Sequence, residues 1–113
     1  MFHAYTNALE LIRALVPVVE RLKTYDANIA DQIVRAATSI TLNVSEGSRR
    51  SGKDRRRFYV MARGSAGEIQ GALDTADASG WRVDAERARE ILDRELRLLA
   101  GLCNEHKRSA SGS

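Results

Sequence analysis

A cluster of basic side chains between residues 49 and 63 has the most specific chemistry in the sequence. Arginine presents a planar fork of N–H donors that matches two phosphate oxygens, and lysine adds a compact positive charge. A single acidic residue, Asp54, lies among seven cations, so this segment has a charge of +6. We expect it to contact the phosphates of a nucleic acid. The seven predicted contact residues are Arg49, Arg50, Lys53, Arg55, Arg56, Arg57 and Arg63.

The distribution of charge favours an anionic partner for this segment. The chain has a net charge of +3, and the residues outside 49–63 sum to −3. Cations at the start of a helix are repelled by the positive end of the helix dipole. This repulsion opposes folding and favours the binding of an anion. The alternative interpretation is a solvated, charged turn, because arginine-rich runs are common. No recognition helix or aromatic stacking platform is evident, so we expect recognition of backbone and shape.

Polar residues also follow one another at helical spacing beside an apolar stripe. Ser39, Asn43 and Glu46 are separated by four and three residues, which places them in one line on a predicted helix. A facing helix would bring further polar side chains to this line. The result would be either a site for a cation, an arginine or a ligand, or a buried network that fixes helix register, which we favour. The predicted network contains Arg35, Ser39, Asn43, Glu46, Ser65 and Glu68.

Metal-binding and nucleophilic residues are few. Di-iron bundles need inward-facing Glu and Glu-x-x-His pairs, but His3 and His106 lie near the chain ends and neither follows a Glu by three residues. Cys103 lies on an apolar stripe, which is more typical of a core residue than of a nucleophile. We therefore expect no catalytic residue, no metal, no cofactor and no enzymatic activity.

Four helices, predicted from the spacing of apolar residues, must position these side chains. The first covers about residues 4–22, the second follows a cap at Asp26 or Asn28 and runs to about Glu46, the third covers about residues 53–79, and the fourth is capped by Asp84. Short connections between successive helices imply an all-α fold, an antiparallel up-down-up-down four-helix bundle.

Capping residues mark several helix ends. Asp26 or Asn28 can accept hydrogen bonds at the start of the second helix. Gly47 should end that helix as glycine usually does, and Gly80 should end the third helix in the left-handed conformation.

The third predicted helix has two unusual features. Ser51 and Asp54 have the spacing of a capping box at its start. Three glycines lie in its interior, and each costs about 0.8–1 kcal/mol relative to alanine. Close approach of another helix would offset this cost, whereas drift at exposed sites is the alternative explanation. The glycines are Gly64, Gly67 and Gly71.

The 113 residues are enough for one domain with a modest core, which must be mainly aliphatic because only 5% of the residues are aromatic. We expect the bundle to span residues 1–108 and a disordered tail to span 109–113. The sequence contains no apolar run of about 18 residues and no visible signal peptide, so we expect no membrane contact. A single cysteine excludes an intrachain disulfide and fits a reducing cytoplasm, the expected location.

Two stretches carry a resemblance to a known family. Residues 34–40 and 43–50, followed by Phe58 and residues 62–69, resemble the two motifs of the four-helix-bundle proteins encoded in 23S ribosomal RNA intervening sequences. The resemblance extends from about Ala8 to Leu102. It implies a four-helix bundle, ring-like homo-oligomers that are commonly pentamers, and no established enzymatic activity. Related bundles are accessory subunits of reverse transcriptases in diversity-generating retroelements, so the resemblance also implies a reverse transcriptase as a candidate partner.

Together these features lead to two functional hypotheses. The first is a non-enzymatic homo-oligomer that binds nucleic acid, RNA in particular, through the basic segment. Broad apolar faces on the first and last predicted helices agree with self-association, and identical basic segments in one assembly would add by multivalency. The second hypothesis is a protein-interaction scaffold whose basic segment docks an acidic protein partner and binds no nucleic acid.

Overall fold

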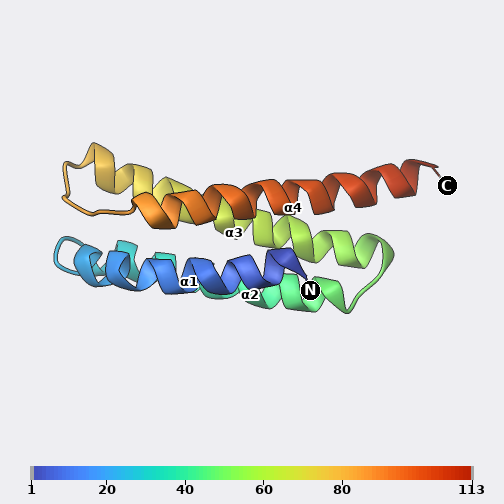
Figure 1. Ribbon diagram of the computed structural model, residues 1–113, viewed down its shortest axis with the longest axis horizontal. Helices are drawn as coiled ribbons and strands as arrows, with labels where there is room; N and C mark the ends of the chain where they lie inside the picture. Colours follow the sequence, from blue (N-terminus) through green and yellow to red (C-terminus); the bar gives the residue numbers. More distant parts are fainter. Residues whose placement is uncertain (1, 113) are drawn as a thin grey trace.

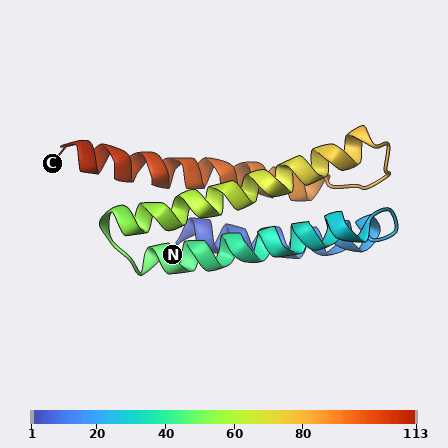
Figure 2. The same cartoon turned by 180° about the vertical axis from the view of Figure 1, so that it is seen from behind.

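Four helices lie side by side along the long axis of the molecule, and each runs opposite to the one before it (Figure 1). The computed structural model describes the backbone of residues 2–112 and the side chains of residues 2–104. The helices are α1 (His3–Leu22), α2 (Ala27–Ser48), α3 (Gly52–Ala78) and α4 (Glu86–Gly112). The view from behind shows the same alternation of direction (Figure 2). The predicted all-α four-helix bundle is therefore confirmed.

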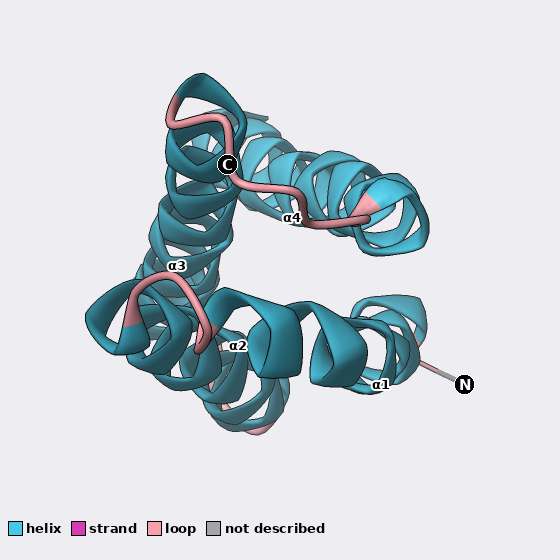
Figure 3. Cartoon of the chain, turned by 90° about the vertical axis from the view of Figure 1, so that its left-hand side faces the viewer, coloured by secondary structure: helices cyan, strands magenta, loops and turns pink. Residues whose placement is uncertain are grey.

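The helices surround one aliphatic core. Seen along the long axis, they stand around a common centre (Figure 3), with α2 and α4 each packed against both α1 and α3. The molecule measures 51 × 23 × 21 Å. Cys103 is fully buried and belongs to the core, as expected. The largest buried aliphatic side chains are Leu11, Leu22, Ile33, Ile40, Ile69, Leu73, Leu92 and Leu99.

Local capping chemistry explains two of the helix ends. Asp26 Oδ1 accepts hydrogen bonds from the backbone N–H groups of Asn28 (2.9 Å) and Ile29 (3.1 Å), so Asp26 is the N-cap of α2. Gly80 has a φ of +76°, and the N–H of the following Trp81 donates to a carbonyl of the last turn of α3. Both caps had been predicted.

Gly47 does not end α2, and this prediction was wrong. The helix continues to Ser48, and among the described residues only Gly52 and Gly80 have a positive φ. Gly47 instead allows α2 to pack closely against α3, because an added Cβ would lie 2.7 Å from Cε1 of the buried Tyr59. The requirement for glycine at this position is therefore tertiary packing.

Two other expectations for α3 were also wrong. Ser51 is the N-cap residue, but its side chain makes no capping hydrogen bond, and the Asp54 carboxylate pairs with Arg50 and Arg57. The three interior glycines of α3 are exposed, and a Cβ added to any of them would contact no described atom within 4 Å. Close helix approach therefore does not explain them within one chain, and the alternative of exposed sites agrees with the structure.

The last helix is longer than the core requires. α4 continues to Gly112 and so includes most of the segment 109–113, where we expected a tail. In Figure 1 its C-terminal end extends beyond the other three helices. None of the helices described within residues 2–112 is long and apolar enough to cross a membrane.

The packing at Gly47 predicts opposite effects for two alanine substitutions. Gly47→Ala should lower the free energy of unfolding by about 1–3 kcal/mol, because the new methyl group overlaps the Tyr59 ring. Gly64→Ala, the matched control, adds its methyl group in open space and should raise stability by up to about 1 kcal/mol through helix propensity. Urea denaturation of both variants measures these changes. A Gly47→Ala variant as stable as the wild type would contradict the packing constraint.

Candidate nucleic-acid interface

Six of the seven predicted contact residues lie at one end of the bundle. Arg49 and Arg50 belong to the connection between α2 and α3, Lys53, Arg55, Arg56 and Arg57 lie in the first two turns of α3, and Arg63 lies further along α3, toward its middle. This end is the right-hand side of Figure 1, where the green segment turns back. We call the seven cations predicted from the sequence the basic face. The positive charge that the basic face can offer to a ligand depends on which of these side chains already form hydrogen bonds or ion pairs within the chain.

Arg55 caps the C-terminus of α2. Its Nε donates to the carbonyl oxygens of Gly47 (3.2 Å) and Arg50 (2.7 Å), and Nη2 donates to that of Ser48 (3.5 Å). Carbonyl groups at a helix C-terminus have no donor within the helix, so this side chain satisfies them. Arg55 is half-buried and holds the turn, and its guanidinium is less available to a ligand than the sequence suggested.

Two carboxylates lie within the basic face. Glu46 accepts from Arg49 Nη2 (3.0 Å) and Arg50 Nε (2.9 Å). Asp54 accepts from Arg50 Nη1 (3.3 Å) and Arg57 Nη2 (2.9 Å). Hydrogen bonds from Arg50 and Arg49 lower the pKa of Glu46 below its usual value, and the bond to Glu46 raises the pKa of Arg50. Three of the seven cations are thus paired within the chain.

An aromatic ring orders two of these arginines. The Cζ of Arg57 lies 4.6 Å from the centre of the Phe58 ring, and that of Arg50 lies 5.5 Å from it. Guanidinium groups over a ring are attracted by its π-electrons, which restricts their orientation. Phe58 is half-buried, and the sequence interpretation had not recognised it as part of this surface.

The remaining cations have no carboxylate partner among the described residues. Lys53 is exposed, whereas Arg56 and Arg63 are half-buried, and Arg56 Nε is buried without a hydrogen-bond acceptor in the side chains and backbone that the structure describes. Lys53 and Arg56 also lie in the first turn and a half of α3, where the helix dipole disfavours positive charge. Arg49 and Arg50 follow the negative end of α2, so the unfavourable placement expected from the sequence applies to only part of the basic face.

The predicted polar network is divided between two places. Ser65 Oγ of α3 donates to Ser39 Oγ of α2 (2.8 Å), and Asn43 Nδ2 donates to Ser39 Oγ (3.0 Å) and to its carbonyl (2.9 Å). These three side chains link the two helices, and no charged side chain among residues 2–104 pairs with them. The other three lie apart from them: Arg35 is exposed and pairs with Asp31, Glu46 belongs to the basic face, and Glu68 is exposed.

A more deeply buried polar pair was missed. Asn7 Nδ2 of α1 donates to Glu95 Oε1 (2.8 Å) and to the Ile91 carbonyl (3.1 Å) of α4, while Glu95 Oε2 has no hydrogen-bond partner within the described part of the chain. Burial raises the pKa of Glu95 to about 7, and the bond from Asn7 opposes this shift. The sequence did contain a signal that Glu95 is buried. It lies three residues after Leu92 and four before Leu99, on the same helix face, and both leucines are fully buried.

Metal-binding and nucleophilic chemistry have little support in the described part of the chain. No group of three or more His, Cys, Asp or Glu residues within it is placed to hold a metal ion. Cys103 is enclosed by the core, and His3 is exposed at the start of α1. The side chain of His106 lies outside the described residues.

The Glu95 carboxyl predicts a pH-dependent stability. Because its pKa is raised in the folded state, folding is favoured by protonation, and stability should fall as pH rises from about 4.5 to above 7. Glu95→Gln is uncharged at every pH and should be more stable than the wild type at pH 8, by up to about 3 kcal/mol, with little difference at pH 4.5. Denaturant titrations at both pH values test this. The exposed Asp93→Asn on the same helix should show no such gain, and an equal gain would assign the effect to overall charge.

Comparison with known proteins agrees with this architecture. A family model described as 23S rRNA-intervening sequence protein matches residues 2–102, which include α1, α2, α3 and most of α4. A search of curated proteins found no match.

Proposed function

Because the chain belongs to the family of 23S rRNA-intervening sequence proteins, we propose that it is a non-enzymatic protein that binds nucleic acid, RNA in particular, through the basic face. The observation that carries this proposal is that Lys53, Arg56 and Arg63, all in the N-terminal half of α3, have no carboxylate partners among the described residues. Phosphates would supply the missing negative charge. Contacts of this kind recognise the backbone and carry no base sequence.

Docking of an acidic protein is the alternative function. The basic face already binds two carboxylates, so a protein partner would exchange one carboxylate for another at Arg49, Arg50 and Arg57. A phosphate backbone presents charges at short, regular intervals and can also reach the unpaired cations. This difference favours nucleic acid. A reverse transcriptase, the partner that the resemblance implies, acts on nucleic acid and is compatible with the proposal.

The unpaired cations provide the first test. Replacing Lys53, Arg56 and Arg63 with Gln should weaken RNA binding at least tenfold in low salt. The slope of log affinity against log salt should become shallower by about 2, since each phosphate contact on a single strand contributes about 0.7. Fluorescence anisotropy with one structured RNA and one unrelated strand measures both. The losses should be similar for the two RNAs. Arg55 is left intact because it caps α2.

A control variant separates position from total charge. Replacing Arg82, Arg87 and Arg94 with Gln removes the same charge from exposed sites in the α3–α4 connection and the first half of α4, away from the basic face. This variant should bind RNA within about twofold of the wild type. If both variants bind RNA as the wild type does, the basic face is only a solvated turn. Binding of polyglutamate without binding of RNA would support the acidic-protein alternative.

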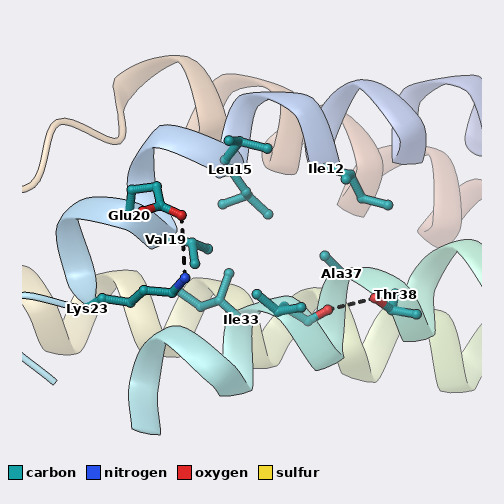
Figure 4. Close-up of a pocket in the computed structure, with 10 residues that line it drawn as sticks. Ile12, Leu15, Val19, Glu20, Lys23, Ile33, Ala37 and Thr38 are labelled. Carbon is teal, nitrogen blue, oxygen red and sulfur yellow. Dashed lines mark hydrogen bonds and ion pairs between the residues drawn. The ribbon is translucent and has the colours of Figure 1, made fainter. Parts of the chain in front are cut away.

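Self-association is the second part of the proposal. A groove of about 270 Å³ lies between α1 and α2, with apolar side chains such as Ile12, Val19 and Ala37 along it (Figure 4). Val16 and Val34, also in its lining, are 58% and 46% exposed. Glu20 and Lys23, which form an ion pair, lie at its border and offer both signs of charge to an identical partner. We propose that a second copy covers this groove, in a ring that the family resemblance implies to be a pentamer.

A charge placed in the groove tests this assembly. The wild type should scatter light as a closed oligomer, most simply a pentamer, at micromolar concentration. Val34→Glu should reduce the measured mass to that of a monomer, because the carboxylate would be buried without a partner. Met61→Glu, on an exposed part of α3 outside the groove, should leave the mass unchanged. A monomeric wild type would contradict the proposed assembly.

A further inference from the structure

The four ion pairs of the basic face form one continuous chain. It runs from Arg49 through Glu46 to Arg50, and then through Asp54 to Arg57. Each carboxylate thus binds two guanidinium groups, and Arg50 connects the two carboxylates. The distances of 2.9–3.3 Å are those of direct hydrogen bonds.

The stability of the fold does not account for this chain of ion pairs. The two acidic side chains are 32% and 41% exposed and the three arginines 48–65%, and ion pairs at such exposure contribute little to stability. Glu46 also lies in the last turn of α2, where the helix dipole disfavours negative charge. The turn itself is held by a different residue, Arg55, through backbone carbonyls.

We propose that Glu46 and Asp54 are specificity-determining residues that compete internally with phosphate for Arg49, Arg50 and Arg57. This inference rests on the proposed function. A carboxylate offers the arginine fork the same arrangement of two oxygen acceptors as a phosphate does. A phosphate that reaches this surface must therefore displace a carboxylate that is already bound and fixed nearby.

The competition selects ligands with several phosphates. When an isolated phosphate binds a paired arginine, it replaces a carboxylate with another anion, so little free energy is gained. A strand that also contacts the unpaired Lys53, Arg56 and Arg63 gains those interactions at once, and its next phosphates are then held close to the paired arginines. The basic face should therefore discriminate against small anions. The ion pairs also keep the guanidinium groups ordered over Phe58, which reduces the entropy lost on binding.

The inference is tested by removing the internal competitors. Glu46→Gln with Asp54→Asn keeps the shape of both side chains and removes both charges. The double variant should bind a 20-nucleotide single-stranded RNA about tenfold more tightly than the wild type, with a steeper salt dependence. Inorganic phosphate should displace RNA from it at severalfold lower concentration than from the wild type. The matched control, Asp31→Asn with Glu90→Gln, removes two carboxylates from similar ion pairs that lie away from both the basic face and the groove. Its affinity should stay within about twofold of the wild type.

A measurement on the wild type makes the test independent of how well the variant folds. Carboxyl ¹³C NMR should show the pKa of Glu46 rising when RNA binds, because its arginine partners are taken by phosphates. If wild-type protein binds RNA but neither the double variant binds more tightly than the control nor the Glu46 pKa changes, the inference is wrong and the proposed function stands. If no version binds RNA, the proposed function fails and the inference fails with it.

Discussion

The close approach of α2 and α3 at Gly47 is the constraint on which the basic end of the bundle depends. Any larger residue there would occupy space that the ring of Tyr59 fills. Because the helices meet so closely, three residues suffice to connect them, and Arg55 reaches back to the Gly47 and Ser48 carbonyl oxygens at the end of α2. One packing contact and one capping side chain therefore determine the direction in which the cations project.

Local patterns in the sequence predicted the features that local interactions determine. The spacing of apolar residues predicted the helices, and on α2 the apolar Ile33, Ala36 and Ile40, which lie three and four residues apart, are all in the core. Asp26 and Gly80 were recognised as caps because cap hydrogen bonds join residues only a few positions apart. The bundle followed from four such helices and short connections. The cluster of cations was equally visible, because the charge of each residue and its position in the chain are read directly from the sequence.

The partners of long polar side chains could not be predicted in the same way. Glu46 has the sequence spacing of the predicted polar network, but its side chain points toward Arg49 and Arg50, which follow α2. The spacing of residues does not determine which rotamer a long side chain adopts. Arg55 was counted as a free cation because its acceptors are backbone carbonyls, which every residue has. The pair of Asn7 and Glu95 joins residues 88 positions apart, so only the packed structure brings them together.

The contacts between α1 and α4 join residues much farther apart in the sequence than the contacts between α2 and α3 near the basic face do. Arg55 bonds to groups five to eight residues before it, whereas the α1–α4 seam closes only when residues more than 80 positions apart meet. Loop-closure entropy makes long-range contacts slower to form than local ones. We therefore expect the α2–α3 hairpin to form early in folding and the α1–α4 seam to close last, an order that amide hydrogen exchange during refolding would report. The basic face would then be assembled before the fold is complete.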